Sequence, residues 1–113
     1  MQLPQDALLL RVFIGENDRH GVKPLYEAIV LAARERGLAG ATVLRGPMGY
    51  GVSSRLHTAK ILRLSEDLPL VIEIVDSKDR IEAFLPVLET MMTASGLVTL
   101  EKVQVIRYGA AKP

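Results

Sequence analysis

The residues best suited to chemistry lie in one polar stretch, Arg45 to Lys60. Its three glycines and two serines, with several basic side chains, fall between two segments typical of β-strands. Glycine lets the backbone turn its N–H groups inward, and serine, arginine and lysine add further donors. Because this chemistry suits a phosphate or another small anion, we predict a ligand-binding loop. The candidates in it are Arg45, Gly46, Gly49, Gly51, Ser53, Ser54, Arg55, His57 and Lys60.

Arg55 is the leading candidate, because a guanidinium can hold a phosphate through two parallel hydrogen bonds. Ser53 and Ser54 have an alternative role as modification sites, since a phosphate added beside Arg55 would order the loop. His57 suits a ligand contact or an interface hydrogen bond better than catalysis, because no acidic orienting partner lies close in sequence. The alternative to a ligand site is a flexible loop that docks a partner protein.

A second polar group, Glu16, Asp18 and His20, places oxygen and imidazole side chains at alternating positions. Metal binding there is the minor alternative to a solvated loop that begins a helix. We do not expect catalysis. The chain has no Ser-His-Asp pattern in a recognisable elbow, no Walker lysine and no metalloprotease signature.

The composition is typical of one globular domain, with 113 residues, 49% hydrophobic and 24% charged. A net charge of +1 argues against bulk electrostatic binding to nucleic acid. The absence of cysteine excludes disulfides and thiolate metal sites. Without a signal peptide or an apolar run long enough to span a membrane, a cytoplasmic protein with no membrane insertion is expected. We predict one domain over 1–113, with its core at about 7–108 and a flexible tail at 109–113.

The candidate ligand residues must be positioned by regular secondary structure. The hydrophobic pattern predicts two β-α-β halves joined by the polar connection, 46–64. Strands are expected over 7–15, 41–45, 68–75 and 98–108, helices over 24–36 and from Asp76 or Ser77 to Gly96, and a polar loop over 16–21. The later half of the connection, 58–64, is itself expected to be extended. Pro86 should kink the second helix. Two such halves form a ferredoxin-like α+β sandwich, with four antiparallel strands and both helices on one face.

The other face of this sheet has no helix over it. Strand alternation directs a largely apolar set of side chains toward it, namely Leu9, Arg11, Phe13, Val71, Glu73 and Val75. A face of this kind is too apolar for a solvated monomer, so we predict a homo-oligomer that buries it. The first and third strands are neighbours in this topology, which allows Arg11 and Glu73 to pair.

The element order and two motifs, Leu44 to Gly51 and Leu68 to Val75, resemble PII-type signalling proteins. The chain is most similar to a PII-like family catalogued as domain of unknown function one-ninety, from roughly Leu8 to Ile106. The resemblance implies a homotrimer with clefts between subunits. In such proteins the loop between strands two and three and a second loop, here 94–102, hold an adenine nucleotide. Gly96 and Thr99 are the candidates in the second loop, which lacks the usual arginine.

The resemblance therefore implies a ligand-sensing regulator. A small anionic effector such as an adenine nucleotide would bind between subunits and order the 46–64 loop. The loop would then engage a membrane transporter or a regulated enzyme. Two alternatives remain open. One is a divalent-metal-binding trimer of the ion-tolerance type, which would use His20, His57 and Asp18, and the other is an enzyme acting on a phosphorylated small molecule in the same cleft.

Overall fold

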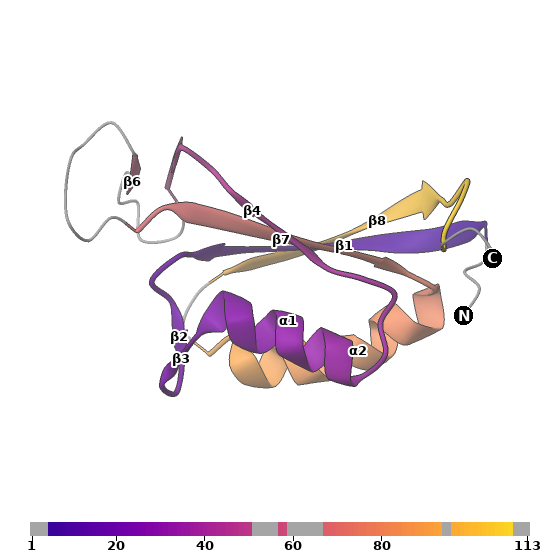
Figure 1. The fold of residues 1–113 in the computed structure, drawn as a ribbon, viewed down its shortest axis with the longest axis horizontal. Helices are drawn as coiled ribbons and strands as arrows, with labels where there is room; N and C mark the ends of the chain where they lie inside the picture. The colour runs from indigo at the N-terminus through magenta and orange to yellow at the C-terminus, as the bar shows by residue number, and fades with distance from the viewer. Residues whose placement is uncertain (1–4, 51–56, 59–66, 94–95, 110–113) are drawn as a thin grey trace.

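The fold is a four-stranded antiparallel sheet with two helices against one of its faces (Figure 1). The computed structural model describes residues 5–50, 57–58, 67–93 and 96–109. The sheet order is β4-β7-β1-β8, with β1 at Asp6–Gly15, β4 at Thr42–Arg45, β7 at Pro69–Asp76 and β8 at Leu97–Gln104. The helices are α1, Leu25–Glu35, and α2, Lys78–Met91. The predicted ferredoxin-like α+β fold is confirmed.

Two short hairpins complete the described structure. Strands β2, Arg19–His20, and β3, Lys23–Pro24, form a hairpin beyond the end of β1, where the sequence predicted only a polar loop. Strands β5, Met48–Gly49, and β6, His57–Thr58, pair within the predicted polar connection. Of the extended segment predicted over 58–64, only Thr58 falls among the described residues.

The core lies between the sheet and the helices, and it follows from the alternation of the strands. In β1, Leu10, Val12 and Ile14 face the helices, as predicted, and are buried. The helices add apolar side chains at three- and four-residue spacing, chiefly Leu25, Ile29, Ala33, Ile81, Phe84, Leu88 and Met91. In the described part of the chain, no helix is long and apolar enough to cross a membrane.

The helix ends agree with the predicted signals except at the end of α2. Ser77 caps α2, where its hydroxyl accepts a hydrogen bond from the Arg80 backbone N–H at 3.3 Å. Gly37, at φ +75°, follows the end of α1 as expected. However, α2 ends at Met91, so Gly96 starts the path into β8 and does not end the helix. The helix continues through Pro86, and a kink there stays a prediction.

A buried carboxylate organises the end of the sheet where β7 runs into α2. Asp76 is fully buried and accepts hydrogen bonds from the backbone N–H groups of Ala39 at 2.9 Å and Ser77 at 2.7 Å. The guanidinium Nε of Arg80 lies 3.7 Å from the same carboxylate. The Tyr108 hydroxyl donates to the carbonyl of Ala39 at 2.8 Å, so the C-terminal segment is fixed at this end too. Asp76 thereby links the α1–β4 connection to the start of α2.

Candidate functional site

The polar connection starts at the end of the sheet where β1 ends and β7 begins. Strand pairing places Gly15 opposite Pro69 and Arg45 opposite Leu70. The Gly46 backbone N–H donates to the carbonyl of Pro69 at 2.8 Å, which extends the contact with β7 beyond β4. Figure 1 shows β6 beyond this end of the sheet, which is also the end where the β2–β3 hairpin lies, on the helix side. The connection therefore has a fixed base next to Arg45.

Two of the candidate glycines pack directly on Pro69. A Cβ atom would lie 3.1 Å from the Pro69 Cγ at Gly46, and 3.0 Å from it at Gly49. Both distances are tighter than ordinary side-chain contacts, so a Cβ at either position would force a local shift of a few tenths of an ångström. Gly49 also pairs with His57 across the β5–β6 hairpin. These glycines therefore shape the base of the connection.

Arg45, the last residue of β4, already has an anionic partner. Its Nη2 donates to the carboxylate of Glu16, which follows the end of β1. The Glu16 backbone N–H donates to the carbonyl of Leu68 at 2.8 Å, which fixes the position of Glu16 beside Arg45. The Arg45 side chain is 61% exposed and that of Glu16 is 23% exposed. An anion that binds Arg45 from solvent must therefore compete with Glu16.

Two carboxylates hold the loop after β1 through backbone hydrogen bonds, one from the loop itself and one from the residue two before β7. Asp18 accepts from the Gly15 backbone N–H at 3.0 Å, and Asp67 accepts from that of Asn17 at 2.8 Å. The Leu25 backbone N–H donates to the Asp18 carbonyl at 2.7 Å, which positions the start of α1. These bonds hold the loop against both β1 and α1.

The metal alternative has no support at this loop. Glu16 binds Arg45, Asp18 turns toward the backbone of Gly15, and His20 is exposed in β2. Across the described residues, no group of three His, Cys, Asp or Glu side chains could hold a metal ion. The structure does not bring Glu16, Asp18 and His20 together as a binding site.

The two candidates of the second loop lie on opposite sides of the sheet. Thr99 is paired with Arg11 in the β1–β8 register, so it shares the face that the helices leave open. Gly96 has φ +129°, and a Cβ there would lie 2.3 Å from the Met92 Cε and 3.3 Å from the Phe13 carbonyl oxygen. The side chain of Thr99 and the Cβ direction of Gly96 therefore point to different faces, and a ligand contact that involves both residues stays a prediction.

Several predicted ligand residues cannot be placed. Gly51, Ser53, Ser54, Arg55 and Lys60 lie outside the described residues. For His57 the structure gives only its position in β6. A ligand role for these residues stays a prediction.

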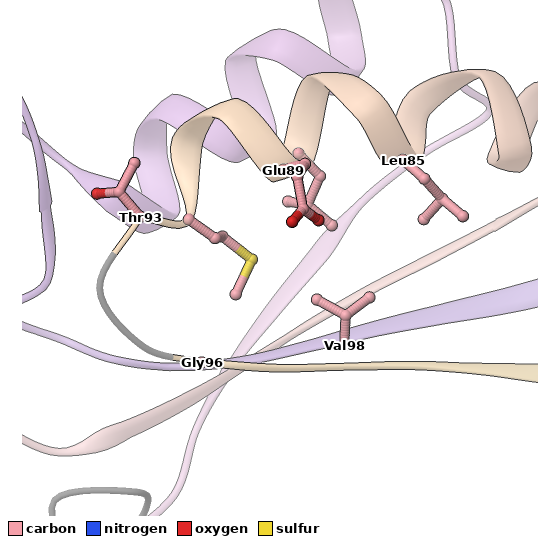
Figure 2. Close-up of a pocket in the computed structure, with 7 residues that line it drawn as sticks. Leu85, Glu89, Thr93, Gly96 and Val98 are labelled. Carbon is pink, nitrogen blue, oxygen red and sulfur yellow. The ribbon is translucent and has the colours of Figure 1, made fainter.

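Sequence reasoning missed a pocket between the C-terminal half of α2 and the start of β8. The pocket has a volume of about 430 Å³. Figure 2 shows the side chains that line it. It is lined by Leu85, Leu88, Glu89, Met92, Thr93, Gly96 and Val98. Helical spacing identified the leucines and methionines only as core residues. Their contact with β8 depends on how α2 crosses the sheet, which no sequence pattern specifies.

The open face, meaning the sheet surface opposite the helices, carries a network of three charges. Arg11 donates through Nε to Glu73 and through Nη1 to Glu101, both at 2.9 Å. The Arg11–Glu73 pair is as predicted, whereas Glu101 was not expected. The hydrogen bond that Arg11 donates to Glu73 raises the pKa of Arg11 above its ordinary value, so Arg11 remains charged. Apolar neighbours on this face are Leu9, Phe13, Val71, Val75, Leu44 and Leu97.

Comparison with known families and proteins identifies relatives along most of the chain. The family DUF190, described as "Uncharacterized ACR", matches residues 7–105. A "UPF0166 protein" from Aquifex aeolicus (strain VF5) is 42% identical over 98 residues, which cover 87% of this chain and 91% of that protein. Another from Methanocaldococcus jannaschii is 34% identical over 94 residues, which cover 83% of this chain and 86% of the relative.

Two solved structures share the fold. Both are of CPII, a nitrogen regulatory PII-like protein from Thiomonas intermedia K12. The form bound to ADP, AMP and bicarbonate has a TM-score of 0.61 and 18% identity, and 90% of each chain is covered. The form bound to ADP and bicarbonate has a TM-score of 0.59 and 20% identity, with the same coverage. The predicted PII-like fold and the resemblance to family one-ninety are confirmed.

Proposed function

This chain belongs to the DUF190 family and has a PII-like fold, and we propose that it is a regulator that senses a small anionic ligand. The observation that carries the proposal is the base of the polar connection, where Arg45 leaves β4 beside two glycines packed on Pro69. Both CPII structures of the same fold contain ADP and bicarbonate, and one also contains AMP, which makes an adenine nucleotide the first ligand to test. The protein acts by binding and performs no catalysis.

The ligand acts on the 46–64 connection. An anion that binds Arg45 and the basic residues beyond it stabilises one arrangement of the connection over others. Binding can shift the arrangement only if the ligand contacts one state better than the other. The favoured arrangement then engages or releases a partner, such as a membrane transporter or a regulated enzyme. Copies of the chain assemble through the open face, as a trimer in the cytoplasm, and the ligand lies between them.

Calorimetric titration of the purified protein tests the proposal directly. AMP, ADP, ATP, cyclic AMP and bicarbonate are titrated separately, with and without divalent metal ions. We expect saturable binding of at least one adenine nucleotide. The Arg55→Ala variant should bind it about tenfold or more weakly, because a charge-assisted hydrogen bond contributes about 1.5–3 kcal/mol.

The matched control is Arg34→Ala, which removes an exposed arginine in the last turn of α1. This variant should bind like the unmodified protein. No saturable signal from any nucleotide would contradict the proposal. Binding of divalent metals alone would favour the ion-tolerance alternative.

Glu16 is expected to weaken ligand binding, because its carboxylate occupies Arg45 and repels an incoming anion. The Glu16→Gln variant should therefore bind the same nucleotide about threefold to tenfold more tightly, the range expected for losing an exposed ion pair and a nearby like charge. Calorimetric titration gives the Kd of both proteins. Glu35→Gln, a matched change in the exposed last residue of α1, should leave the Kd for the nucleotide unchanged. Weaker or equal binding by Glu16→Gln would show that no such competition exists.

A further inference from the structure

Strand β8 forms one edge of the sheet and pairs with β1 on one side only. Within the described ranges of the chain, no strand covers its other side, so backbone N–H and C=O groups along Leu97–Gln104 are free to pair. Three apolar side chains of this strand are exposed, Leu97, Val98 and Leu100. Unless it is protected, a long edge strand with exposed apolar side chains pairs readily with another strand. The edge therefore has the chemistry to accept a β-strand.

A second copy of β8 is complementary to this edge. When two antiparallel copies are related by a two-fold axis perpendicular to the sheet, their helices lie on the same face and paired residues share a face. The register centred on Leu100 pairs 97–103 and places no like charges opposite each other. The registers centred on Glu101 and Lys102 each oppose two like charges, which is destabilising, and the register centred on Thr99 pairs only 97–101.

The register centred on Leu100 brings complementary side chains together on both faces of the sheet. On the helix face, Leu100 meets its own counterpart, and Val98 lies opposite Lys102 of the second copy. This face is fixed by the pairing of β8 with β1, where the opposite residues belong to the core or pack against it. On the open face, Thr99 lies opposite Glu101 of the second copy, so its hydroxyl can donate to that carboxylate.

The pocket beside β8 provides a partner for the lysine. Val98 lines this pocket from β8 and Glu89 lines it from α2 (Figure 2). In the part of the chain that the structure describes, Glu89 has no hydrogen bond or ion pair. The apolar lining suits the methylene stem of a lysine, and the Glu89 carboxylate suits its ammonium group. Lysine on an edge strand usually discourages pairing, but here the second copy supplies the opposite charge.

We propose that two copies of this chain associate by antiparallel pairing of their β8 strands, centred on Leu100. Lys102 of each copy then enters the α2–β8 pocket of the other and lies beside Glu89. The contact goes beyond the proposed function and is separate from the open-face assembly, because it uses the edge of the sheet and the helix side. The two contacts can therefore be tested independently.

Cysteine cross-linking tests the register directly, because the chain contains no cysteine. Paired residues of antiparallel strands have Cα atoms about 4.5–5.5 Å apart, which suits a disulfide. Leu100→Cys should therefore form a linked dimer about tenfold or more faster than Val98→Cys, whose counterpart lies out of register. Val98 is a matched control on the same face, at 39% exposure against 44% for Leu100. Non-reducing electrophoresis during oxidation with glutathione disulfide measures the rates.

A mixed sample checks the same register with different residues. Val98→Cys and Lys102→Cys should each cross-link slowly alone, because neither lies opposite its own counterpart. Mixed together, the two variants should form a linked dimer faster than either does alone, because Val98 of one copy lies opposite Lys102 of the other. Circular dichroism of each variant checks that it folds.

Charge reversal tests the pocket contact by sedimentation equilibrium. Glu89→Lys and Lys102→Glu should each weaken association about threefold to tenfold, because each places like charges together at two symmetry-related positions. The double variant should restore association, since it exchanges the two charges. Glu82→Lys, the same change at an exposed position of α2 that does not line the pocket, should associate like the unmodified protein.

The inference is overturned if Leu100→Cys cross-links no faster than Val98→Cys, or if neither charge reversal changes the association constant. Should the cysteine variants fail to fold, the charge-reversal series decides the question by itself. An assembly that persists unchanged in Glu89→Lys would leave the open-face proposal standing without the β8 contact. A monomer at every concentration, in the unmodified chain and in all variants, would overturn both contacts.

Discussion

Replacing Asp76 by alanine is expected to lower the free energy of unfolding by about 3–5 kcal/mol, as for the loss of one partner from a buried charged network. Asp76 is fully buried and accepts hydrogen bonds from the backbone N–H groups of Ala39 and Ser77. Without the carboxylate, these donors lose their partner, and the Arg80 guanidinium loses its anion. Urea unfolding followed by circular dichroism measures the change.

The comparison variant is Asp79→Ala, which removes an exposed carboxylate from the first turn of the same helix. That loss should cost less than about 1 kcal/mol, because it affects only the favourable interaction with the helix N-terminus. Asp76→Asn keeps the volume but turns one acceptor into a donor, so it should fall between the two. Equal costs for Asp76→Ala and Asp79→Ala would show that the buried carboxylate does not link the α1–β4 connection to α2.

The strands and helices with clear periodicity could be predicted from sequence, whereas those defined by pairing could not. The inward set of β1 follows from alternation alone, and the end of α1 follows from Gly37. The last strand was predicted to continue to Tyr108 but ends at Gln104. Gln104 pairs with Asp6, the first residue of β1. The Val105 backbone N–H still donates to the Gln5 carbonyl at 2.6 Å, but neither residue belongs to a strand. The β2–β3 hairpin was missed because its strands are two residues long and lack apolar alternation.

In the candidate site, too, contacts that follow from the topology could be predicted, whereas contacts that depend on strand register could not. The Arg11–Glu73 pair could be predicted because the topology makes β1 and β7 neighbours. Glu101 could not be assigned to Arg11, because its position depends on the register between β1 and β8. The Arg45–Glu16 pair joins residues 29 positions apart, and no local pattern links them. Composition located the polar connection, and only the folded chain shows which charges at its base are already paired.

Replacing Gly96 by alanine is expected to destabilise the protein by about 1–3 kcal/mol, the cost of holding a side-chain residue in a rarely populated backbone region. Gly96 has φ +129°, which residues with a Cβ rarely adopt. The new Cβ would also lie 2.3 Å from the Met92 Cε and 3.3 Å from the Phe13 carbonyl oxygen. Urea unfolding of both proteins gives the difference.

A double-mutant cycle separates the backbone strain from the steric contact. The Met92 methyl is the end of a flexible side chain and can move, whereas the Phe13 carbonyl belongs to the paired strand β1. Adding Met92→Ala to Gly96→Ala should therefore recover only a minor part of the loss. Gly40→Ala is the control, because a Cβ there meets nothing within 4 Å and its φ is not in the positive region. That change should be neutral or stabilise by up to about 1 kcal/mol. If Met92→Ala recovered the whole loss, the contact with the Met92 methyl, and not the backbone conformation before β8, would be the reason that position 96 needs glycine.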